Sequence, residues 1–544
     1  MRYISVFLLL LSQNIFAQSA TKADKKIIEH LKSEIGYLAD DKLEGRRTGM
    51  EGEKLAYEYL EKEFKNAGFE TFLTGKTYIQ PFDVNDGKEI KTATFSINAV
   101  PFKPNEDFFP MAYSANAAGL IINGVKTSGL VTYDMAGVQL GNTNNPHFDI
   151  KQDIYDKAKQ AQQKGVALFL IFNSDSSKTG LSFENKDKNE RLKIPVICLE
   201  GSAYKAAFKN ISPAEIENIV IRTTIEIIES HRTGHNVIGY INNNAANTII
   251  LGAHYDHLGY GEDHNSLYAG KPPMIHNGAD DNASGTAALL ELGRWLKNSN
   301  YKQYNYLLIS FSGEELGLFG SKYFTDHPGL DLKTVDYMIN MDMVGRLNDS
   351  THGLTVGGYG TSPEWGKLIS KNDPYFKINI DSSGVGPSDH TSFYRKDIPV
   401  LFFFTGSHKD YHKPTDDADK INYAGELQVI HYIQNIIAAT NGENKIAFTK
   451  THDAVAGKNT FKVSLGIMPD YTFSEAGVRV DGVSDNRPAQ KAGILTGDVL
   501  IQLGDYKFTD VQTYMDALNK FNKGESTMVK LKRGKEEVIL PITF

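Results

Sequence analysis

The pattern of apolar and polar positions predicts several strands that are buried on both faces and followed at once by polar residues. Residues 248–253 (TIILGA) form an uninterrupted, mostly apolar run, which is typical of a strand inside a parallel sheet. Similar runs occur over Tyr306–Phe311, Tyr337–Met341 and Asp397–Phe404, and His235–Ile241 predicts a further strand. We therefore expect an α/β fold with a mixed, largely parallel sheet and helices on both faces.

Helical spacing of apolar residues occurs before and between these strands. Residues 22–68 carry apolar positions at helical intervals on both sides of a polar connection, residues 43–49 (LEGRRTG). Because this connection is polar and contains glycine, we expect it to be an exposed loop. A further helix is predicted to run through Leu296, with Ser284 as its N-cap.

Histidine and acidic residues follow the predicted strands one after another. A single histidine or aspartate after a strand is usually a cap or turn residue, but several at the same sheet edge indicate a common site. Ligands of open α/β sheets bind outside the carboxyl ends of the strands, so these side chains should converge as a metal site. The candidate donors are His254, Asp281, Glu315, Asp342 and His412, and the neighbouring acids are Asp256, Asp280 and Glu314.

The mixture of donors indicates zinc and a hydrolytic reaction. Neutral imidazoles combined with carboxylates suit zinc, whereas an all-oxygen set would indicate magnesium or calcium. Five protein ligands are too many for one catalytic zinc that keeps a water, but they fit two metals about 3.5–4 Å apart that share a carboxylate. Such a centre also needs a general base that is not a ligand, and the adjacent pair Glu314 and Glu315 could supply a base and a ligand.

Five motifs occur in an order that resembles a known family. HYD, GADDNASG, SGEELG, NMDMVG and YHKPTDD resemble the motifs of the di-zinc aminopeptidases of metallopeptidase family twenty-eight, relatives of glutamate carboxypeptidase, transferrin receptor and glutaminyl cyclase. The resemblance covers roughly residues 22–100 and 233–441. It implies peptide substrates and two bound zinc ions.

The resemblance also assigns roles, position by position. His254 and Asp342 would hold one zinc, Glu315 and His412 the other, with Asp281 as the bridge and Glu314 as the general base.

Other residues would support this centre. Asp256 would lie behind His254 and orient its imidazole, and Asp416 would do the same for His412. Tyr411 resembles a tyrosine that hydrogen-bonds the developing oxyanion, and Asp389 and His390 match a family segment with a supporting role.

Two further units are predicted around this catalytic unit. Residues 101–230 form a β-rich insert with one helical segment, Asp153–Lys164, and the insert resembles a protease-associated domain. Residues 461–544 resemble a PDZ domain, with Leu465, Gly466 and Ile467 in the place of its carboxylate-binding loop, which would capture a peptide C-terminus. The catalytic unit would then comprise residues 18–100 and 231–447, followed by a linker over residues 448–460.

Composition and the N-terminal pattern limit the cellular setting. The net charge of −8 gives no basic footprint for nucleic acid. Met1–Ala17 combines a basic residue, a short apolar stretch and a small residue, which predicts a cleaved signal peptide and no stable membrane insertion. The single Cys198 lies in an apolar run and forms no internal disulfide. We expect an exported bacterial protein, either periplasmic or secreted.

Together these features predict an exported metallo-aminopeptidase that removes N-terminal residues from peptides. A carboxypeptidase or glutaminyl cyclase on the same fold is an alternative, because those relatives share most of the ligands. A non-catalytic binding protein on a degenerate peptidase fold is another.

Overall fold

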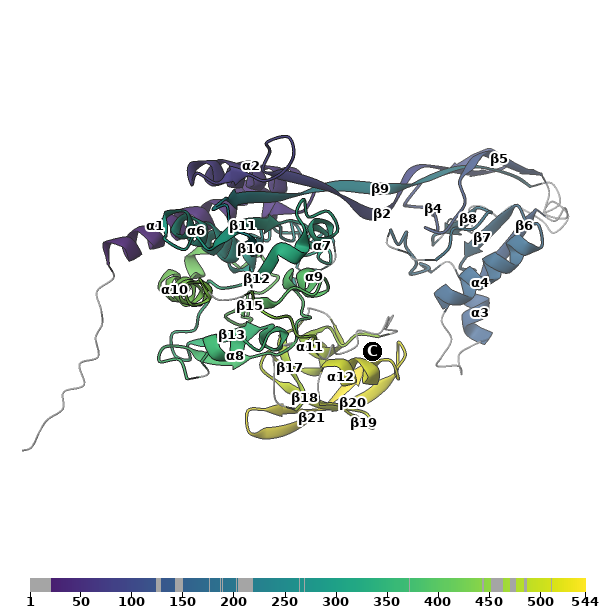
Figure 1. Cartoon of the computed structure of the whole chain (residues 1–544). Coiled ribbons are helices and arrows are strands. Elements are labelled where there is room, and N and C mark those ends of the chain that lie inside the picture. Colours follow the sequence, from purple (N-terminus) through teal and green to yellow (C-terminus); the bar gives the residue numbers. More distant parts are fainter. Residues whose placement is uncertain are drawn as a thin grey trace, which may run out of the picture.

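The computed structural model describes residues 21–123, 129–141, 150–175, 177–185, 187, 189–201, 203, 219–263, 265–268, 270–370, 372–442, 445–451, 463–469, 476–483, 487–509 and 511–544. The predicted signal peptide, and residues 452–460 of the predicted linker, lie outside these residues. Figure 1 shows the described units along the chain: a large α/β unit, an insert reached by a long two-stranded ribbon, and a C-terminal unit.

The large unit is built on an eleven-stranded mixed sheet, which confirms the predicted fold class. Its centre is four adjacent parallel strands, in the order β15 (Val400–Phe404), β12 (Val335–Met341), β10 (Asn247–His254) and β11 (Tyr304–Phe311). The flanking strands are β9 (Val220–Ile241), β2 (Ile79–Ile97), β3 (Val100–Phe102), β13 (Gly353–Gly357), β14 (Lys377–Ile380), β1 (Glu70–Thr71) and β5 (Ala117–Asn123). Because the four central strands are parallel, their carboxyl ends all lie at the same edge of the sheet.

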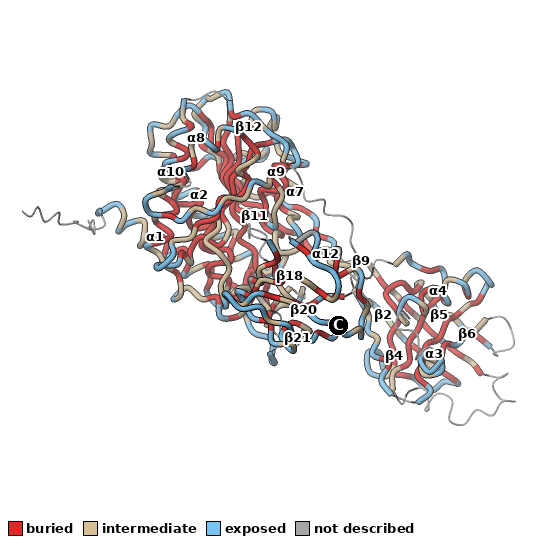
Figure 2. The backbone as a smooth tube through the Cα atoms, turned by 90° about the horizontal axis from the view of Figure 1, so that it is seen from below, coloured by how far each residue is buried: buried red, intermediate tan, exposed pale blue. Residues whose placement is uncertain are grey.

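Helices cover both faces of this sheet, as the continuous apolar runs predict. Ile249 and Leu251 of β10 pack in the core beneath α1 (Lys22–Leu38), α2 (Glu51–Asn66), α6 (Gly285–Asn298) and α10 (Tyr423–Thr440). Ile250 points to the other face, in a core with α7 (Phe319–Asp326) and α9 (His390–Tyr394). Figure 2 shows these strands as the buried centre of the unit. Short helices are α8 (Trp365–Leu368), η1 (Asp41–Arg46), η4 (Leu332–Thr334), η5 (Tyr359–Thr361) and η6 (Ala418–Lys420).

Two local predictions in this unit are wrong. Ser284 does not cap α6: its backbone is already helical, at the end of a π-helical turn over Ala279–Ser284, and its hydroxyl lies 2.8 Å from the carbonyl oxygen of Asp280. Residues 43–49 are not an exposed loop, since Leu43, Gly45, Arg46 and Thr48 are all buried. At both positions, tertiary contacts with distant loops override the structure that the local sequence pattern predicts.

The insert lies beyond the long antiparallel ribbon of β2 and β9, which pair from Ile79 with Val237 to Ile97 with Ile221. Its own sheet has the order β4 (Phe108–Pro110), β8 (Val196–Leu199), β7 (Leu168–Phe172) and β6 (Leu130–Asp134). The described helices that pack on it include the expected one, α4 (Ile150–Gln163), and an unpredicted one, α3 (Met135–Gly141).

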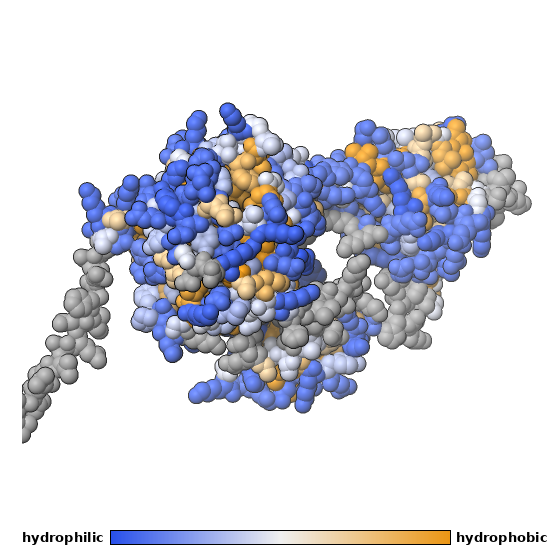
Figure 3. Space-filling view, viewed as in Figure 1, coloured by the Kyte–Doolittle hydropathy of each residue, from blue (hydrophilic) through white to orange (hydrophobic). Residues whose placement is uncertain are grey.

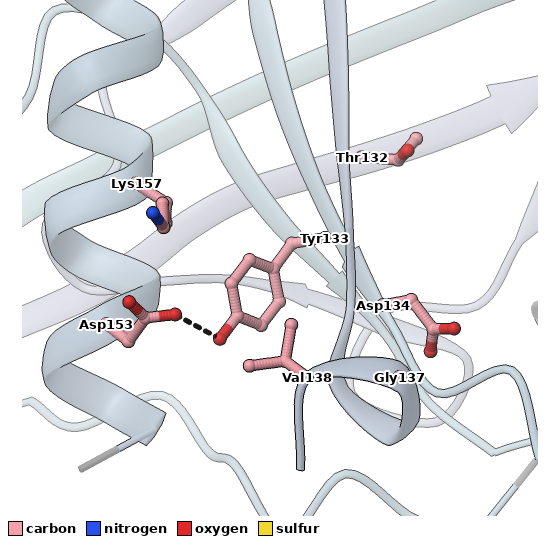
Figure 4. A pocket seen from close by; sticks show the side chains of 7 residues that line it. All are labelled: Thr132, Tyr133, Asp134, Gly137, Val138, Asp153 and Lys157. Carbon is pink, nitrogen blue, oxygen red and sulfur yellow. Dashed lines mark hydrogen bonds between the residues drawn. The ribbon is translucent and has the colours of Figure 1, made fainter. Parts of the chain in front are cut away.

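A shallow hollow lies between β6, α3 and α4 of the insert (Figure 4). The Tyr133 hydroxyl donates a hydrogen bond of 2.6 Å to Asp153 Oδ2 across it, which ties the helix to the edge of the sheet.

The C-terminal unit forms a separate sheet with its own core. The sheet order is β16 (Ile467–Pro469), β17 (Val478–Val483), β18 (Val499–Leu503), β20 (Ser526–Arg533) and β21 (Glu536–Thr543), with β19 (Tyr506–Lys507) beside β18. Helices α11 (Pro488–Ala492) and α12 (Val511–Leu518) complete the unit.

The surface of the molecule is mostly hydrophilic in the view of Figure 3, with a gathering of hydrophobic residues over the β5 end of the insert. Within the described residues, none of the helices combines the length and the apolar composition needed to span a bilayer.

Candidate metal centre

The central parallel strands deliver the predicted donors to one edge of the sheet. His254 is the last residue of β10, Asp342 directly follows β12, and Glu315 lies in the loop after β11. Asp281 lies in the π-helical turn that precedes α6, and His412 lies in the loop after β15. The five side chains come from five separate segments, yet all are buried or nearly so.

The distances divide these donors into two groups that share Asp281. In the first group, His254 Nε2 lies 3.4 Å from Asp281 Oδ1 and 3.5 Å from Asp342 Oδ1. In the second group, His412 Nε2 lies 3.2 Å from Asp281 Oδ2 and 3.3 Å from Glu315 Oε2. Each oxygen of Asp281 therefore faces a different imidazole, which is the arrangement expected of a carboxylate between two cations.

A third imidazole, His257, lies in the second group and was not assigned a role from the sequence. Its Nδ1 donates a hydrogen bond of 2.8 Å to Glu315 Oε1 and lies 3.9 Å from Asp281 Oδ2. His257, Asp281 and Glu315 also lie close enough together to hold an ion. The only signal for His257 in the sequence was its position directly after Asp256, because the HYD motif ends at Asp256.

The imidazoles are oriented by backbone carbonyls. His412 Nδ1 donates a 2.8 Å hydrogen bond to the carbonyl oxygen of Asn265, which leaves Nε2 free to face the second group. His254 Nδ1 lies 3.2 Å from the carbonyl oxygen of Asp256 but 3.7 Å from its carboxylate. Both the backbone carbonyl and the carboxylate of Asp256 therefore lie beside His254 Nδ1, with the carbonyl oxygen the nearer of the two.

The Asp256 carboxylate instead joins two other segments. Its Oδ1 accepts a 3.2 Å hydrogen bond from the backbone N–H of Glu314, and its Oδ2 accepts a 2.9 Å hydrogen bond from the Thr48 hydroxyl. Glu314 Oε2 lies 4.0 Å from His254 Nε2, and 10% of the Glu314 side chain is exposed. Asp256 therefore positions the loop that carries Glu314.

Asp416 and Asp280 hold the turn that carries Asp281. Asp416 Oδ2 accepts hydrogen bonds from the backbone N–H groups of Asp280 and Asp281, at 2.9 and 3.0 Å, and makes none with His412. The expected support of His412 by Asp416 is therefore not what the structure has. Asp280 Oδ1 accepts a 2.7 Å hydrogen bond from the backbone N–H of Gly345, and its Oδ2 lies 3.1 Å from His408 Nε2.

The remaining predicted residues line the same region. The Tyr411 ring stacks on His412, with ring centroids 4.0 Å apart. His390 stacks on Phe402, and Asp389 is fully buried with no hydrogen-bond partner on either carboxylate oxygen. Burial raises the pKa of Asp389 to about 7 and lowers that of His390 to about 4.

Two imidazoles of the site lie among buried negative charges. Burial opposes protonation of His254, but the negative charges of Asp342 and Glu314 outweigh burial and raise the pKa of this imidazole well above its ordinary value. Burial is likewise outweighed at His412, where Glu315 raises the pKa. Within the described part of the chain, no lysine or arginine pairs with any of the five acids at the site (Asp256, Asp281, Glu314, Glu315 and Asp342).

Such a cluster of buried acids is costly without a compensating cation. Divalent cations would displace the protons that the imidazoles otherwise hold. Imidazole nitrogens and carboxylate oxygens together are a donor set that zinc accepts. The residues present therefore fit two metal ions, one in each group.

In the C-terminal unit, the predicted carboxylate-binding loop enters β16. Leu465 is fully buried and its carbonyl oxygen accepts a 2.8 Å hydrogen bond from the backbone N–H of Ala489. Gly466 has a φ of 75°, a conformation that favours glycine. Ile467 is the first residue of β16, which pairs with β17.

The fold and this site define an α/β protein with a two-metal centre at the carboxyl ends of its parallel strands. Residues 236–438 match the Peptidase family M28, and residues 446–543 match the PDZ domain family. The two matches follow each other along the chain in the order that the motifs predicted.

Individual relatives agree with this family. The chain is 27% identical over 282 residues to aminopeptidase YwaD of Bacillus subtilis. This similarity covers 49% of this chain and 56% of the relative. It is 26% identical over 323 residues to leupeptin-inactivating enzyme 1 of Streptomyces exfoliatus, covering 53% and 66% respectively. The chain therefore spans between half and two thirds of the length of these relatives.

A solved zinc aminopeptidase from Bacillus subtilis is also similar, at 20% identity and a TM-score of 0.44. The similarity covers 77% of this chain and 98% of that one.

Proposed function

We propose that this chain is a zinc-dependent aminopeptidase that hydrolyses the first peptide bond of its substrates. The observation that carries the proposal is the placement of Asp281, whose two carboxylate oxygens face His254 and His412 separately. In this assignment, His254 and Asp342 hold one zinc ion and Glu315 and His412 the other, with Asp281 between them. The zinc ions, when bound, would polarise the scissile carbonyl and lower the pKa of the attacking water.

Glu314 is the proposed general base. Its carboxylate lies 4.0 Å from His254 Nε2, and its backbone is fixed by the hydrogen bond to Asp256. Desolvation raises the pKa of Glu314 well above its ordinary value, in the direction that a residue needs in order to hold a proton between steps. It would accept a proton from the attacking water and pass it to the leaving amine. Tyr411, stacked on His412, is the proposed donor to the developing oxyanion.

The charge of the site favours an aminopeptidase over a carboxypeptidase. A carboxypeptidase must bind the terminal carboxylate of its substrate, whereas an aminopeptidase must bind a terminal ammonium group. Within the described residues, the side chains gathered here are acids and imidazoles, and none of the five acids pairs with a lysine or arginine that could bind a substrate carboxylate. A terminal carboxylate would therefore find no cationic side chain at these acids, whereas a terminal ammonium group needs none.

Two further proposals concern the rest of the chain. The loop over Leu465, Gly466 and Ile467 is proposed to bind a peptide C-terminus through its backbone N–H groups, as PDZ domains do. The pattern of Met1–Ala17 supports an exported location, for which sequencing the N-terminus of the native protein is the direct measurement.

Replacing Glu314 tests the catalytic assignment. Glu314→Gln keeps the size of the side chain but cannot accept a proton, so kcat should fall by about 10²–10⁴-fold while two equivalents of zinc remain bound. Glu262→Gln is the matched control, because Glu262 is an acid of a neighbouring loop with 40% of its side chain exposed. Turnover by Glu314→Gln at the rate of the control would refute the assignment, and loss of zinc would show that Glu314 is a ligand instead.

The substrate class is tested with paired peptides. A peptide with a free N-terminus should be cleaved, and the same peptide with an acetylated N-terminus should not. Equal cleavage of both would refute the aminopeptidase proposal. Mass spectrometry of an N-terminal glutamine peptide separates hydrolysis from cyclisation, because only a cyclase forms pyroglutamate.

A further inference from the structure

Arg46 is a fully buried arginine whose guanidinium donates hydrogen bonds to four backbone carbonyl groups. Its Nε donates a 2.7 Å hydrogen bond to the carbonyl oxygen of Tyr255, and its Nη2 a 2.9 Å hydrogen bond to that of Gly278. Its Nη1 donates to the carbonyl oxygens of Leu38 and Asn277, the latter at 2.6 Å. Among the described residues, no side-chain carboxylate accepts a hydrogen bond from Arg46.

These carbonyls belong to the two segments that carry the shared centre. Tyr255 lies between His254 and Asp256, at the exit of β10. Asn277 and Gly278 lie immediately before the π-helical turn that carries Asp281. One rigid, planar group with donors pointing in several directions therefore links the segment of the first imidazole to the segment of the bridging carboxylate.

The backbone around Arg46 is held in an unfavourable conformation to make this contact. Glu44, Gly45 and Arg46 have consecutive φ angles of 47°, 69° and 50°, and left-handed non-glycine residues persist only where their surroundings fix them. The backbone N–H of His257 donates to the carbonyl oxygen of Arg46 at 3.3 Å, and that of Gly259 to Gly45 at 3.1 Å. The segment is thus bound along its length to the loop that follows His254.

Arg46 also adds a positive charge to an acidic site. Burial lowers the pKa of its guanidinium to about 10, partly offset by the negative charges of Asp281, Asp256, Asp416 and Glu315. It therefore stays charged at neutral pH. A positive charge at this place repels divalent cations, so electrostatics alone gives no reason for an arginine here if the site binds metal.

We propose that Arg46 is a positioning residue of the metal centre, which fixes His254 and Asp281 relative to each other by bridging their backbones. The proposal depends on the proposed function in one respect, namely that the site binds zinc. Positioning of the donors by Arg46 would strengthen metal binding, whereas the positive charge of Arg46 would weaken it. Because these two effects on metal affinity have opposite signs, a variant can distinguish them.

The test is zinc affinity of the full chain, measured by competition with a chromophoric chelator on metal-free protein, together with the visible absorption of the cobalt-substituted protein. Arg46→Met removes the charge and the donors but keeps most of the volume. If Arg46 acts only through its charge, this variant should bind zinc more tightly. If it positions the donors, zinc binding should weaken by about 10–100-fold, as for other residues that orient metal ligands, and the cobalt spectrum should change.

Arg46→Lys and Arg294→Met complete the set. Lysine keeps the charge but not the fork of donors, so zinc binding should again weaken, and this variant decides the question if Arg46→Met fails to fold. Arg294 is a matched control, because it is a largely buried arginine that pairs with Glu34, Glu63 and Glu291 away from the donors. Arg294→Met should lower stability without changing zinc affinity or the cobalt spectrum.

The outcomes separate this proposal from the proposed function. Unchanged or tighter zinc binding by Arg46→Met overturns the positioning role, and so does wild-type binding by Arg46→Lys. Equal weakening by Arg294→Met would reduce the effect to general loss of stability and also overturn it. If the wild-type chain takes up no zinc at all, the proposed function itself fails.

Discussion

The hydrogen bond from Thr48 to Asp256 provides a quantitative test of how the site is held together. Thr48 belongs to the segment predicted to be an exposed loop, yet it is 1% exposed and its hydroxyl donates to Asp256 Oδ2 at 2.9 Å. Asp256 itself is 0% exposed. Thr48→Val replaces the hydroxyl by a methyl group of similar size, so it removes the donor without opening a cavity.

The expected magnitude follows from the charge of the acceptor. A hydrogen bond to a charged group contributes about 1.5–3 kcal/mol, and a buried carboxylate oxygen left without its partner costs at least as much. The Thr48→Val variant should therefore lose about 1.5–3 kcal/mol of unfolding free energy. Because the other oxygen of Asp256 accepts from the backbone N–H of Glu314 at 3.2 Å, a displaced Asp256 should also shift Glu314 and lower kcat/KM.

The assay is urea unfolding of zinc-free protein, followed by kinetics of the zinc-loaded protein. Thr48→Ser is the matched control, because it keeps the hydroxyl and loses only a methyl group. Serine should retain most of the stability and of kcat/KM. If Thr48→Val and Thr48→Ser unfold at the same urea concentration and turn over equally fast, the hydrogen bond does not stabilise the site and the reasoning fails.

Two further predictions concern stability. Gly45→Ala should cost more than about 1–2 kcal/mol, since φ is 69° and an added Cβ would lie 2.5 Å from the carbonyl oxygen of His276. Gly36→Ala lies in the last turn of α1, where an added Cβ meets no atom within 4 Å, so it should instead stabilise the protein by about 0.4–1 kcal/mol. Urea midpoints that move together would contradict this contrast. Glu426 is fully buried with neither carboxylate oxygen hydrogen-bonded, and burial holds its pKa well above the ordinary value. The folded protein therefore keeps a proton that the unfolded chain releases above about pH 4.3, so this residue costs stability as the pH rises, by up to about 1.4 kcal/mol per pH unit. The Glu426→Gln variant should gain on the wild type in urea unfolding from pH 5 to pH 8, whereas a constant difference would show that Glu426 is ionised in the folded state.

Much of the fold could be predicted from the sequence because its local signals are strong. The strands β10, β11, β12 and β15 are buried on both faces. Burial on both faces requires apolar side chains at successive positions, so these strands appear in the sequence as uninterrupted apolar runs. Histidine or acidic residues follow these strands one after another, and this regular order indicated a common site. The second helix of the insert, α3, escaped prediction because its seven residues carry little helical periodicity.

The details of the site depend on contacts between segments that are distant in sequence. Ser284 has the residue type of an N-cap, but its hydroxyl lies against Asp280 and the loop after β12. Asp416 was predicted from its position to orient His412. In the structure it instead accepts hydrogen bonds from two backbone N–H groups of the turn before α6.

By itself, the sequence determined the strands, the order of the motifs and the choice of five candidate donor side chains, since periodicity and residue chemistry are local properties. Only the tertiary structure decided which oxygen of Asp281 faces which imidazole, that His257 lies beside Glu315, and that Arg46 and Thr48 are buried within the site. The physical reason is that a buried polar group must find its partners wherever the fold brings them. Partners that come from remote segments leave no mark in the local pattern of a chain.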